Sequence, residues 1–198
     1  MNPVIWLLGL SGSGKTTLGS LLRLYLEGQG IETELVDGDR FRRQFGITGF
    51  TQADRIHNIN AMRDHVLDLH SQGKACVVAA ITPYESMRAQ NRAMLPQYRE
   101  VWVRCSLRTL AQRDTKGLYA RAANGRVANL TGVSDTFDEP RHADCIIDTD
   151  RYELGVCYEQ LRDLTLDVLN EGRTLRYGMK YMLPATHMPY LGAAAIAL

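Results

Sequence analysis

The sequence has no excess of charge, no long apolar run and no paired cysteines, and each absence excludes a class of protein. Its 198 residues carry a formal net charge of +1, so bulk charge gives no reason to expect binding to nucleic acid or to a membrane. No apolar stretch approaches the roughly 20 residues that a membrane-spanning helix needs. The four cysteines lack C-x-x-C spacing, which argues against a zinc site and fits a reducing cytoplasm.

The chain also lacks a basic region before its first apolar run, so we expect no secretory signal peptide. Its length is that of one domain with a sizeable core. We expect this domain to span residues 1–172. The remaining tail, residues 173–198, holds aromatic residues, methionines and prolines without a clear period. Its role is open, and we expect it to pack over the domain.

The stretch from Gly9 to Thr16 is the strongest motif of the chain. It reads Gly-Leu-Ser-Gly-Ser-Gly-Lys-Thr and matches the phosphate-loop (Walker A) pattern G-x-x-x-x-G-K-[ST]. An apolar run from Val4 to Leu8 precedes it and predicts a buried strand, while Thr17 to Gln29 shows helical spacing. Strand, glycine loop and helix form the context that this motif requires.

A loop of this kind binds polyphosphate through free backbone N–H groups and the positive end of the helix dipole. Lys15 can reach the β- and γ-phosphates, and the Thr16 hydroxyl can ligate Mg²⁺. We therefore expect ATP and Mg²⁺ here. The predicted phosphate-binding residues are Gly9, Ser11, Gly12, Ser13, Gly14, Lys15, Thr16 and Thr17.

Strand-like runs alternate with helix-like segments along the rest of the chain. Strands are expected at residues 31–36, 76–81, 101–105 and 145–148, and helices at about 51–73, 86–94, 107–114 and 152–169. Residues 40–51 are expected to be irregular. This alternation predicts an α/β fold of the three-layer P-loop NTPase type, with helices on both faces of a parallel sheet. Residues 114–141 are expected to form a long loop or lid containing a turn of helix.

Two carboxylates follow the second predicted strand, at Asp37 and Asp39. Ligands of open parallel sheets bind beyond the carboxyl ends of the strands, and phosphoryl transfer needs carboxylates near the metal and near the attacking oxygen. The third strand ends at Thr82 and supplies no acid. Asp37 and Asp39 are therefore the best candidates, although either could instead cap a turn.

The rest of the pattern favours a kinase of small molecules or nucleotides. No Asn-Lys-x-Asp element for reading guanine is present, and a motor or transporter ATPase would normally be longer. A lid excludes water, so that ATP is not hydrolysed instead of transferred. Arg113 and Lys116 are among the cations that the predicted lid offers to polyphosphate, although such residues also form ordinary solvated surfaces.

Several further motifs resemble those of adenylylsulfate kinases. They are the phosphate loop, Asp37-Gly38-Asp39 followed by Arg42, Gly49-Phe50-Thr51, Asp54-Arg55-Ile56-His57-Asn58-Ile59, Arg113-Asp114-Thr115-Lys116-Gly117-Leu118-Tyr119 and Leu130-Thr131-Gly132-Val133. The resemblance covers about residues 4–169. It implies ATP- and Mg²⁺-dependent phosphorylation of the 3′-hydroxyl of adenosine 5′-phosphosulfate by a homodimer.

The resemblance also implies roles for individual residues. Asp37 or Asp39, with Asp39 favoured, would orient or deprotonate the acceptor hydroxyl, and Asp37 would help to hold the metal. Lys15 joins them as a catalytic residue, and Arg113 would lie on the ATP side. The implied acceptor-binding residues are Arg42, Phe50, Arg55, Asn58, Ile81, Thr82, Lys116 and Leu130. Among these, Phe50 would stack on the adenine.

Three residues depart from the family pattern, and all three are expected on the acceptor side. Leu130 stands where the family usually has Phe, Glu85 where it has Arg, and Arg40 where it has Asn. The alternative is therefore a related kinase that phosphorylates a cytidine diphosphoramidate in bacterial capsule biosynthesis. Two further hypotheses are a nucleotide-binding regulator without turnover and the kinase partner of a separate sulfurylase.

Overall fold

One parallel sheet of five strands lies at the centre of the protein, in the order β2-β3-β1-β4-β5. The computed structural model describes residues 2–181, and their side chains as far as residue 171. The strands are β1 (Val4–Leu8), β2 (Thr33–Asp37), β3 (Ala75–Ala79), β4 (Tyr98–Arg104) and β5 (Cys145–Asp148). Neighbouring strands all pair in parallel, which confirms the predicted fold class.

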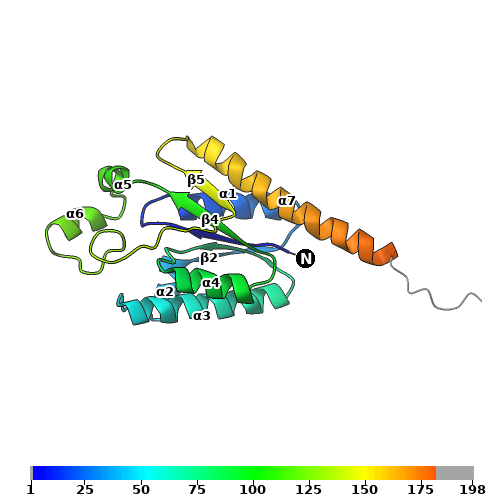
Figure 1. Ribbon diagram of the computed structural model, residues 1–198, viewed down its shortest axis with the longest axis horizontal. Helices are drawn as coiled ribbons and strands as arrows, with labels where there is room; N and C mark the ends of the chain where they lie inside the picture. Colours follow the sequence, from blue (N-terminus) through cyan, green and yellow to red (C-terminus); the bar gives the residue numbers. More distant parts are fainter. Residues whose placement is uncertain (1, 182–198) are drawn as a thin grey trace, which may run out of the picture.

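Helices cover both faces of the sheet (Figure 1). They are α1 (Lys15–Gly28), α2 (Gly38–Gln44), α3 (Gln52–Ser71), α4 (Glu85–Met94), α5 (Leu107–Arg113), α6 (Leu118–Ala123) and α7 (Leu154–Tyr181). Helices α1 and α7 lie on one face and α2, α3 and α4 on the other, while α5 and α6 lie beyond the end of the sheet (Figure 1). Helix α6 falls inside the segment predicted as a lid.

The central strand β1 explains why the core has two halves. All five of its residues are fully buried. Val4, Trp6 and Leu8 belong to the cluster under α3 and α4, whereas Ile5 and Leu7 belong to the cluster under α1 and α7. Because side chains alternate along a strand, a strand covered on both faces must be apolar throughout. The loop that follows β1 is therefore anchored in the most buried part of the molecule.

Helix α3 begins as its sequence predicts. Thr51 is the N-cap, and its hydroxyl accepts a hydrogen bond from the backbone N–H of Asp54 (3.2 Å). The Asp54 carboxylate accepts one in return from the Thr51 N–H (2.9 Å). This reciprocal capping box satisfies two helix-end donors and fixes the start of the helix that carries Arg55 and Asn58.

The expectation of an irregular segment after Asp39 is wrong at its start, because residues 38–44 form helix α2. The Asp37 carboxylate caps this helix, accepting from the N–H groups of Asp39 (3.1 Å) and Arg40 (3.0 Å). Phe41 is its one buried residue. Two turns with one apolar side chain show no period, so the pattern could not reveal them.

Some element ends also differ from the prediction. Strand β3 stops at Ala79, two residues early, and β4 begins at Tyr98, three residues early. Helix α7 continues to Tyr181, past the expected helix end at residue 169, because the two glycines in this part, Gly172 and Gly178, each cost a long helix only about 1 kcal/mol. The rest of the predicted tail, residues 182–198, lies outside the described residues.

Candidate active site

The phosphate loop joins β1 to α1 in a conformation that requires its glycines. Gly9 has φ +144°, and a Cβ at this position would lie 2.3 Å from the carbonyl oxygen of Val103. Gly12 and Gly14 also have positive φ, at +80° and +102°. These are conformations that other residues rarely adopt. The loop therefore turns tightly against β4 and opens at the end of the sheet where α5 and α6 lie.

Lys15 is buried at the start of α1 and points back at the loop. Its Nζ donates to the carbonyl oxygens of Gly9 (2.8 Å) and Leu10 (2.7 Å). Burial and, secondarily, the charge of Lys116 lower the pKa of Lys15 to about 7. The negative charges of Asp39 and, less strongly, of Asp37 oppose this shift. The positive charge of Lys15 is therefore only partly compensated by neighbouring carboxylates. This is the situation expected of a site that binds an anion.

Asp37 uses its two carboxylate oxygens for two different purposes. Oδ1 caps helix α2, as described above, whereas Oδ2 accepts a hydrogen bond from the Thr16 hydroxyl (2.6 Å). From the sequence, capping a turn and binding a ligand are alternative roles for Asp37. In the structure one oxygen of its carboxylate caps the helix and the other is left for a ligand. A hydroxyl and a carboxylate are the hard oxygen ligands that Mg²⁺ prefers, so Thr16 and Asp37 fit a metal site.

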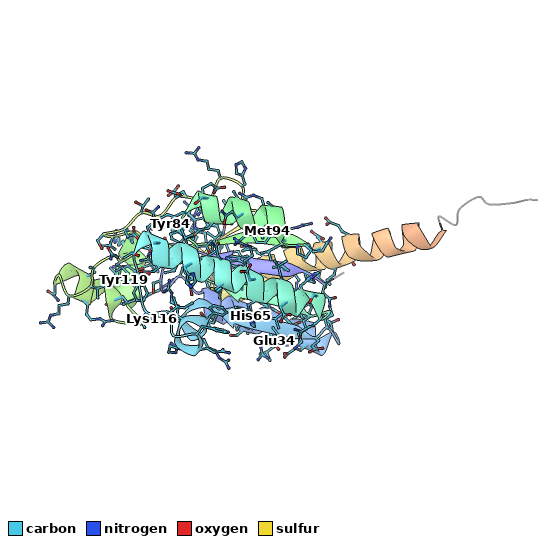
Figure 2. All side chains as sticks on the ribbon, turned by 90° about the horizontal axis from the view of Figure 1, so that it is seen from below. Glu34, His65, Tyr84, Met94, Lys116 and Tyr119 are labelled. Carbon is cyan, nitrogen blue, oxygen red and sulfur yellow. The ribbon has the colours of Figure 1, made fainter. Side chains whose placement is uncertain are left out.

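Asp39 lies in the first turn of α2 and forms an ion pair with Lys116. Burial favours the neutral form of Asp39, but the hydrogen bond and the charge of Lys116 outweigh it and lower the pKa of this carboxyl. Lys116 comes from the segment predicted as a lid and lies at the same end of the molecule as Tyr119 (Figure 2). An ionised Asp39 is a weak base and is better suited to orienting a hydroxyl than to removing its proton early.

One pocket of about 240 Å³ joins the phosphate loop to the predicted acceptor side. Every site residue predicted from the sequence lines it, except Gly9, Ser13, Arg113 and Leu130. Six further lining residues were not predicted: Gly38, Ile59, Ala79, Ala80, Pro83 and Thr115. Most of these lie next to predicted residues at strand ends, where position along the strand was the available signal.

Two arginines flank the ring of Phe50 on the acceptor side of the pocket. The guanidinium carbons of Arg42 and Arg55 lie 4.8 and 5.8 Å from the ring centroid. Phe50 is about half exposed, which leaves ring surface for another group. Burial, followed by the neighbouring charge of Arg55, lowers the pKa of Arg42. A flat aromatic ring beside two guanidinium groups suits a nucleotide. Its base can stack on the ring, and its anionic oxygens can bind the guanidinium groups.

Arg55 is 5% exposed and is held in place by the predicted lid. Its Nε lies 2.9 Å from the carboxylate of Asp135, and it also donates to the carbonyl of Asn129. The Tyr84 hydroxyl, from the loop after β3, lies 3.3 Å from both oxygens of Asp135. Three segments far apart in sequence therefore fix the direction of this guanidinium group.

Asn58 is one turn further along α3 and is 4% exposed. Among the described residues its Oδ1 has no hydrogen-bond partner, and its Nδ2 contacts only the sulfur of Met62, at 3.5 Å. A buried amide without a good partner carries a cost of about 1–3 kcal/mol. Since Asn58 lines the pocket, a polar ligand group there would remove that cost.

Thr82, in the loop that follows β3, has a strained backbone conformation. It is a buried β-branched residue with φ +48°, which is an outlier for that residue type. Its hydroxyl accepts a hydrogen bond from the indole Nε1 of Trp6 (2.8 Å), and its carbonyl accepts one from the buried Arg88 (3.1 Å). The core therefore fixes the backbone that forms one wall of the pocket.

The three departures from the family pattern lie outside this pocket. Leu130 is 6% exposed and packs with Cys105, Leu110 and Tyr119. Glu85 was expected on the acceptor side, but its carboxylate turns away to Arg88 and Arg92, each at 2.7 Å. Arg40 lines a separate groove between α1 and α2. None of the three is a wall of the acceptor side.

Arg113 likewise lies outside the pocket, next to the loop after β5. It donates to the carbonyl of Thr149 (2.7 Å) and approaches the thiol of Cys105 (3.6 Å). The Thr149 hydroxyl in turn donates to the carbonyl of Ser13 in the phosphate loop (3.2 Å). Arg113 is thus connected to the phosphate loop through Thr149.

Within residues 2–181 no helix is long and apolar enough to cross a membrane.

The comparisons with known proteins agree with this geometry. The sequence profile described as "Adenylylsulphate kinase" matches residues 1–148. An adenylyl-sulfate kinase of Chloroflexus aurantiacus is 40% identical over 159 residues, which are 80% of this chain and 86% of the relative. A probable bifunctional SAT/APS kinase of Sorangium cellulosum is 38% identical over 148 residues, which are 74% of this chain but only 25% of that protein.

A solved structure supports the same grouping. The APS kinase of Mycobacterium tuberculosis, determined with AMPPNP and APS, superposes with a TM-score of 0.78 at 30% sequence identity. The match covers 85% of this chain and 98% of that one. Sequence and structure agree over the same part of the chain, and the chain belongs to the adenylylsulfate kinase family.

Proposed function

We propose that the protein transfers the γ-phosphate of ATP to the 3′-hydroxyl of adenosine 5′-phosphosulfate, giving 3′-phosphoadenosine 5′-phosphosulfate. The observation that carries the proposal is the single pocket in which Lys15, Thr16, Asp37 and Asp39 face Arg42, Phe50, Arg55 and Asn58. A phosphate donor site and a cationic, aromatic acceptor site therefore share one space, as direct phosphoryl transfer requires.

On the donor side, the loop N–H groups and Lys15 would bind the triphosphate. Lys15 would leave the carbonyls of Gly9 and Leu10 and place its charge on the phosphate oxygens, where charge accumulates during transfer. We propose that Thr16 and Asp37 hold Mg²⁺, which supplies further neutralisation of that charge when bound. Movement of the Thr16 hydroxyl off Asp37 Oδ2 would free both oxygens for this purpose.

On the acceptor side, Arg42 and Arg55 would bind the anionic 5′ group, and Phe50 would stack on the base. The unpaired amide oxygen of Asn58 would accept a hydrogen bond from a ribose hydroxyl. Asp39 would accept a hydrogen bond from the attacking hydroxyl and so orient it toward the donor. In that role Asp39 would give up part of its contact with Lys116, because Lys116 and the substrate hydroxyl would bind the same carboxylate.

The experiment is a coupled ATP-consumption assay on the purified protein with Mg²⁺, with the product identified by mass. Adenosine 5′-phosphosulfate and cytidine diphosphoramidate are offered side by side. We expect turnover of the sulfate compound, because the three residues that suggested another acceptor do not line the pocket. Turnover of the cytidine compound alone would contradict the proposed acceptor but keep the phosphoryl-transfer chemistry.

We also propose that the protein acts as a homodimer in the cytoplasm. The dimer rests on the family resemblance, and light scattering on the purified protein tests it. The location is supported by the four cysteines, all of them free thiols, which a reducing compartment preserves. Recovery of disulfide-linked protein from cells would contradict that location.

A further inference from the structure

Tyr119 contacts the phosphate loop directly, although it is 108 residues away in sequence. Its hydroxyl donates a hydrogen bond to the carbonyl oxygen of Ser11 at 2.8 Å, and both groups are buried. Figure 2 shows Tyr119 at the same end of the molecule as Lys116. Ser11 is among the site residues predicted from the sequence, but Tyr119 is not.

Tyr119 is fixed from two directions, so its hydroxyl is a precise anchor. Its ring packs in a small cluster with Cys105, Leu110 and Leu130, and Leu10 of the phosphate loop packs against the same cluster. Its backbone N–H donates to the carboxylate of Asp114 at 3.0 Å. Burial raises the pKa of Tyr119 to about 12, so the hydroxyl remains a hydrogen-bond donor throughout the neutral range.

The carbonyl that Tyr119 holds belongs to the central peptide of a tight turn. The N–H of Ser13 donates to the carbonyl of Leu10 at 3.2 Å, which closes a four-residue turn with Ser11 and Gly12 at its centre. Gly12 has φ +80°, the value expected at the third position of a type II turn. Type I and type II turns differ by a flip of the central peptide, and glycine accommodates both.

The direction of this peptide decides where one phosphate donor points. In a planar trans peptide the Ser11 carbonyl and the Gly12 N–H point in opposite directions. The Gly12 N–H makes no hydrogen bond to any of the described residues, and Gly12 lines the pocket. A flipped peptide would instead present a carbonyl oxygen to the phosphates, which would repel them.

We propose that Tyr119 is a positioning residue for the triphosphate: its hydroxyl holds the peptide between Ser11 and Gly12 so that the Gly12 N–H faces the phosphates. The same contact joins helix α6 to the phosphate loop. The inference rests on the proposed function only in taking the bound anion to be a nucleoside triphosphate.

The test is Tyr119→Phe, which removes the hydroxyl and keeps the ring in its cluster. Binding of ATP and of inorganic tripolyphosphate is measured by titration calorimetry with Mg²⁺ and without acceptor. Loss of one neutral hydrogen bond predicts an increase in both dissociation constants of roughly two- to tenfold, by the same factor. In steady state, KM for ATP rises while kcat and KM for the acceptor stay near the wild-type values.

Tyr25→Phe is the matched control, since Tyr25 lies near the other end of α1 and packs in the cluster between the sheet, α1 and α7. It is expected to leave both dissociation constants unchanged. Three results would overturn the proposal: unchanged ATP affinity in Tyr119→Phe, a change for ATP without one for tripolyphosphate, or a fall in Tm with donor and acceptor weakened alike. A wild-type protein that binds ATP but does not phosphorylate the acceptor would contradict only the proposed function, because this test is read from ATP and tripolyphosphate binding.

Discussion

ATP binding is expected to take up a proton at Lys15, and the size of the uptake follows from the structure. In the free protein burial and the charge of Lys116 hold the pKa of Lys15 at about 7. Triphosphate oxygens beside the ammonium favour its charged form and raise that pKa. At pH 8 a group with this pKa is about nine-tenths neutral, and at pH 6 about one-tenth neutral. When the phosphates raise this pKa well above 8, binding takes up most of a proton at pH 8 and little at pH 6.

The sign of the pH dependence follows. Because Lys15 must be protonated to bind well, ATP affinity should be nearly constant below pH 7 and fall above it. The fall is at most about tenfold per pH unit and continues to the pKa of the complex. Titration calorimetry in two buffers of different ionisation enthalpy, with Mg²⁺ in excess, gives the number of protons directly.

Lys116→Met supplies the internal control for this prediction. The substitution removes the second cause of the low pKa and frees Asp39, whose charge opposes the shift. Both changes raise the pKa of Lys15, so proton uptake at pH 8 should fall. Uptake near zero in the wild type at pH 8, or an unchanged uptake in Lys116→Met, would refute the assignment of the proton to Lys15.

Four further substitutions, one of them a control, test the catalytic carboxylate, the contact between lid and loop, and the core. Asp39→Asn should lower kcat roughly 10²- to 10⁴-fold in the coupled assay and leave ATP binding largely intact; unaltered turnover would remove this residue from the mechanism. Gly132→Ala places a Cβ 2.8 Å from the Leu10 side chain at φ +83°, and should cost about 1–3 kcal/mol in urea unfolding. Gly125→Ala has positive φ but open space around it, and should cost less; equal costs would show that the contact with the loop does not matter. Arg88→Met removes a fully buried guanidinium that pairs with Glu85 and with the buried Glu100, so that Arg92 is the cation left beside both carboxylates, and should cost about 3 kcal/mol by the same unfolding measurement; a loss below 1 kcal/mol would mean that this charge cluster is not stabilising.

The sequence predicted what depends on local pattern. The phosphate loop was found from spacing, because its glycines and Lys15 serve a backbone conformation that short-range sequence encodes. The parallel sheet followed from the alternation of apolar runs. Most of the predicted site residues line one pocket, since residues such as Asp39 and Thr82 follow strands whose carboxyl ends meet at one edge; their roles in binding and catalysis stay predictions.

The direction of side chains was harder to predict. Glu85 stands three and seven residues before Arg88 and Arg92, a helical spacing that brings these side chains to one face, yet it was assigned to the acceptor by comparison with a family motif. Leu130 was assigned in the same way and lies in a core cluster. Tyr119 was part of a recognised motif, but nothing local showed that its hydroxyl reaches Ser11.

The protein has a third, smaller hydrophobic cluster, separate from the two that flank the sheet, and this division has a consequence for stability. Its four buried residues, Cys105, Leu110, Tyr119 and Leu130, hold helix α6 and its flanking loops against the body. A unit held by so few contacts can open at a lower free energy than the whole domain unfolds. Amide hydrogens of α6 should therefore exchange well before those of β1 and β3.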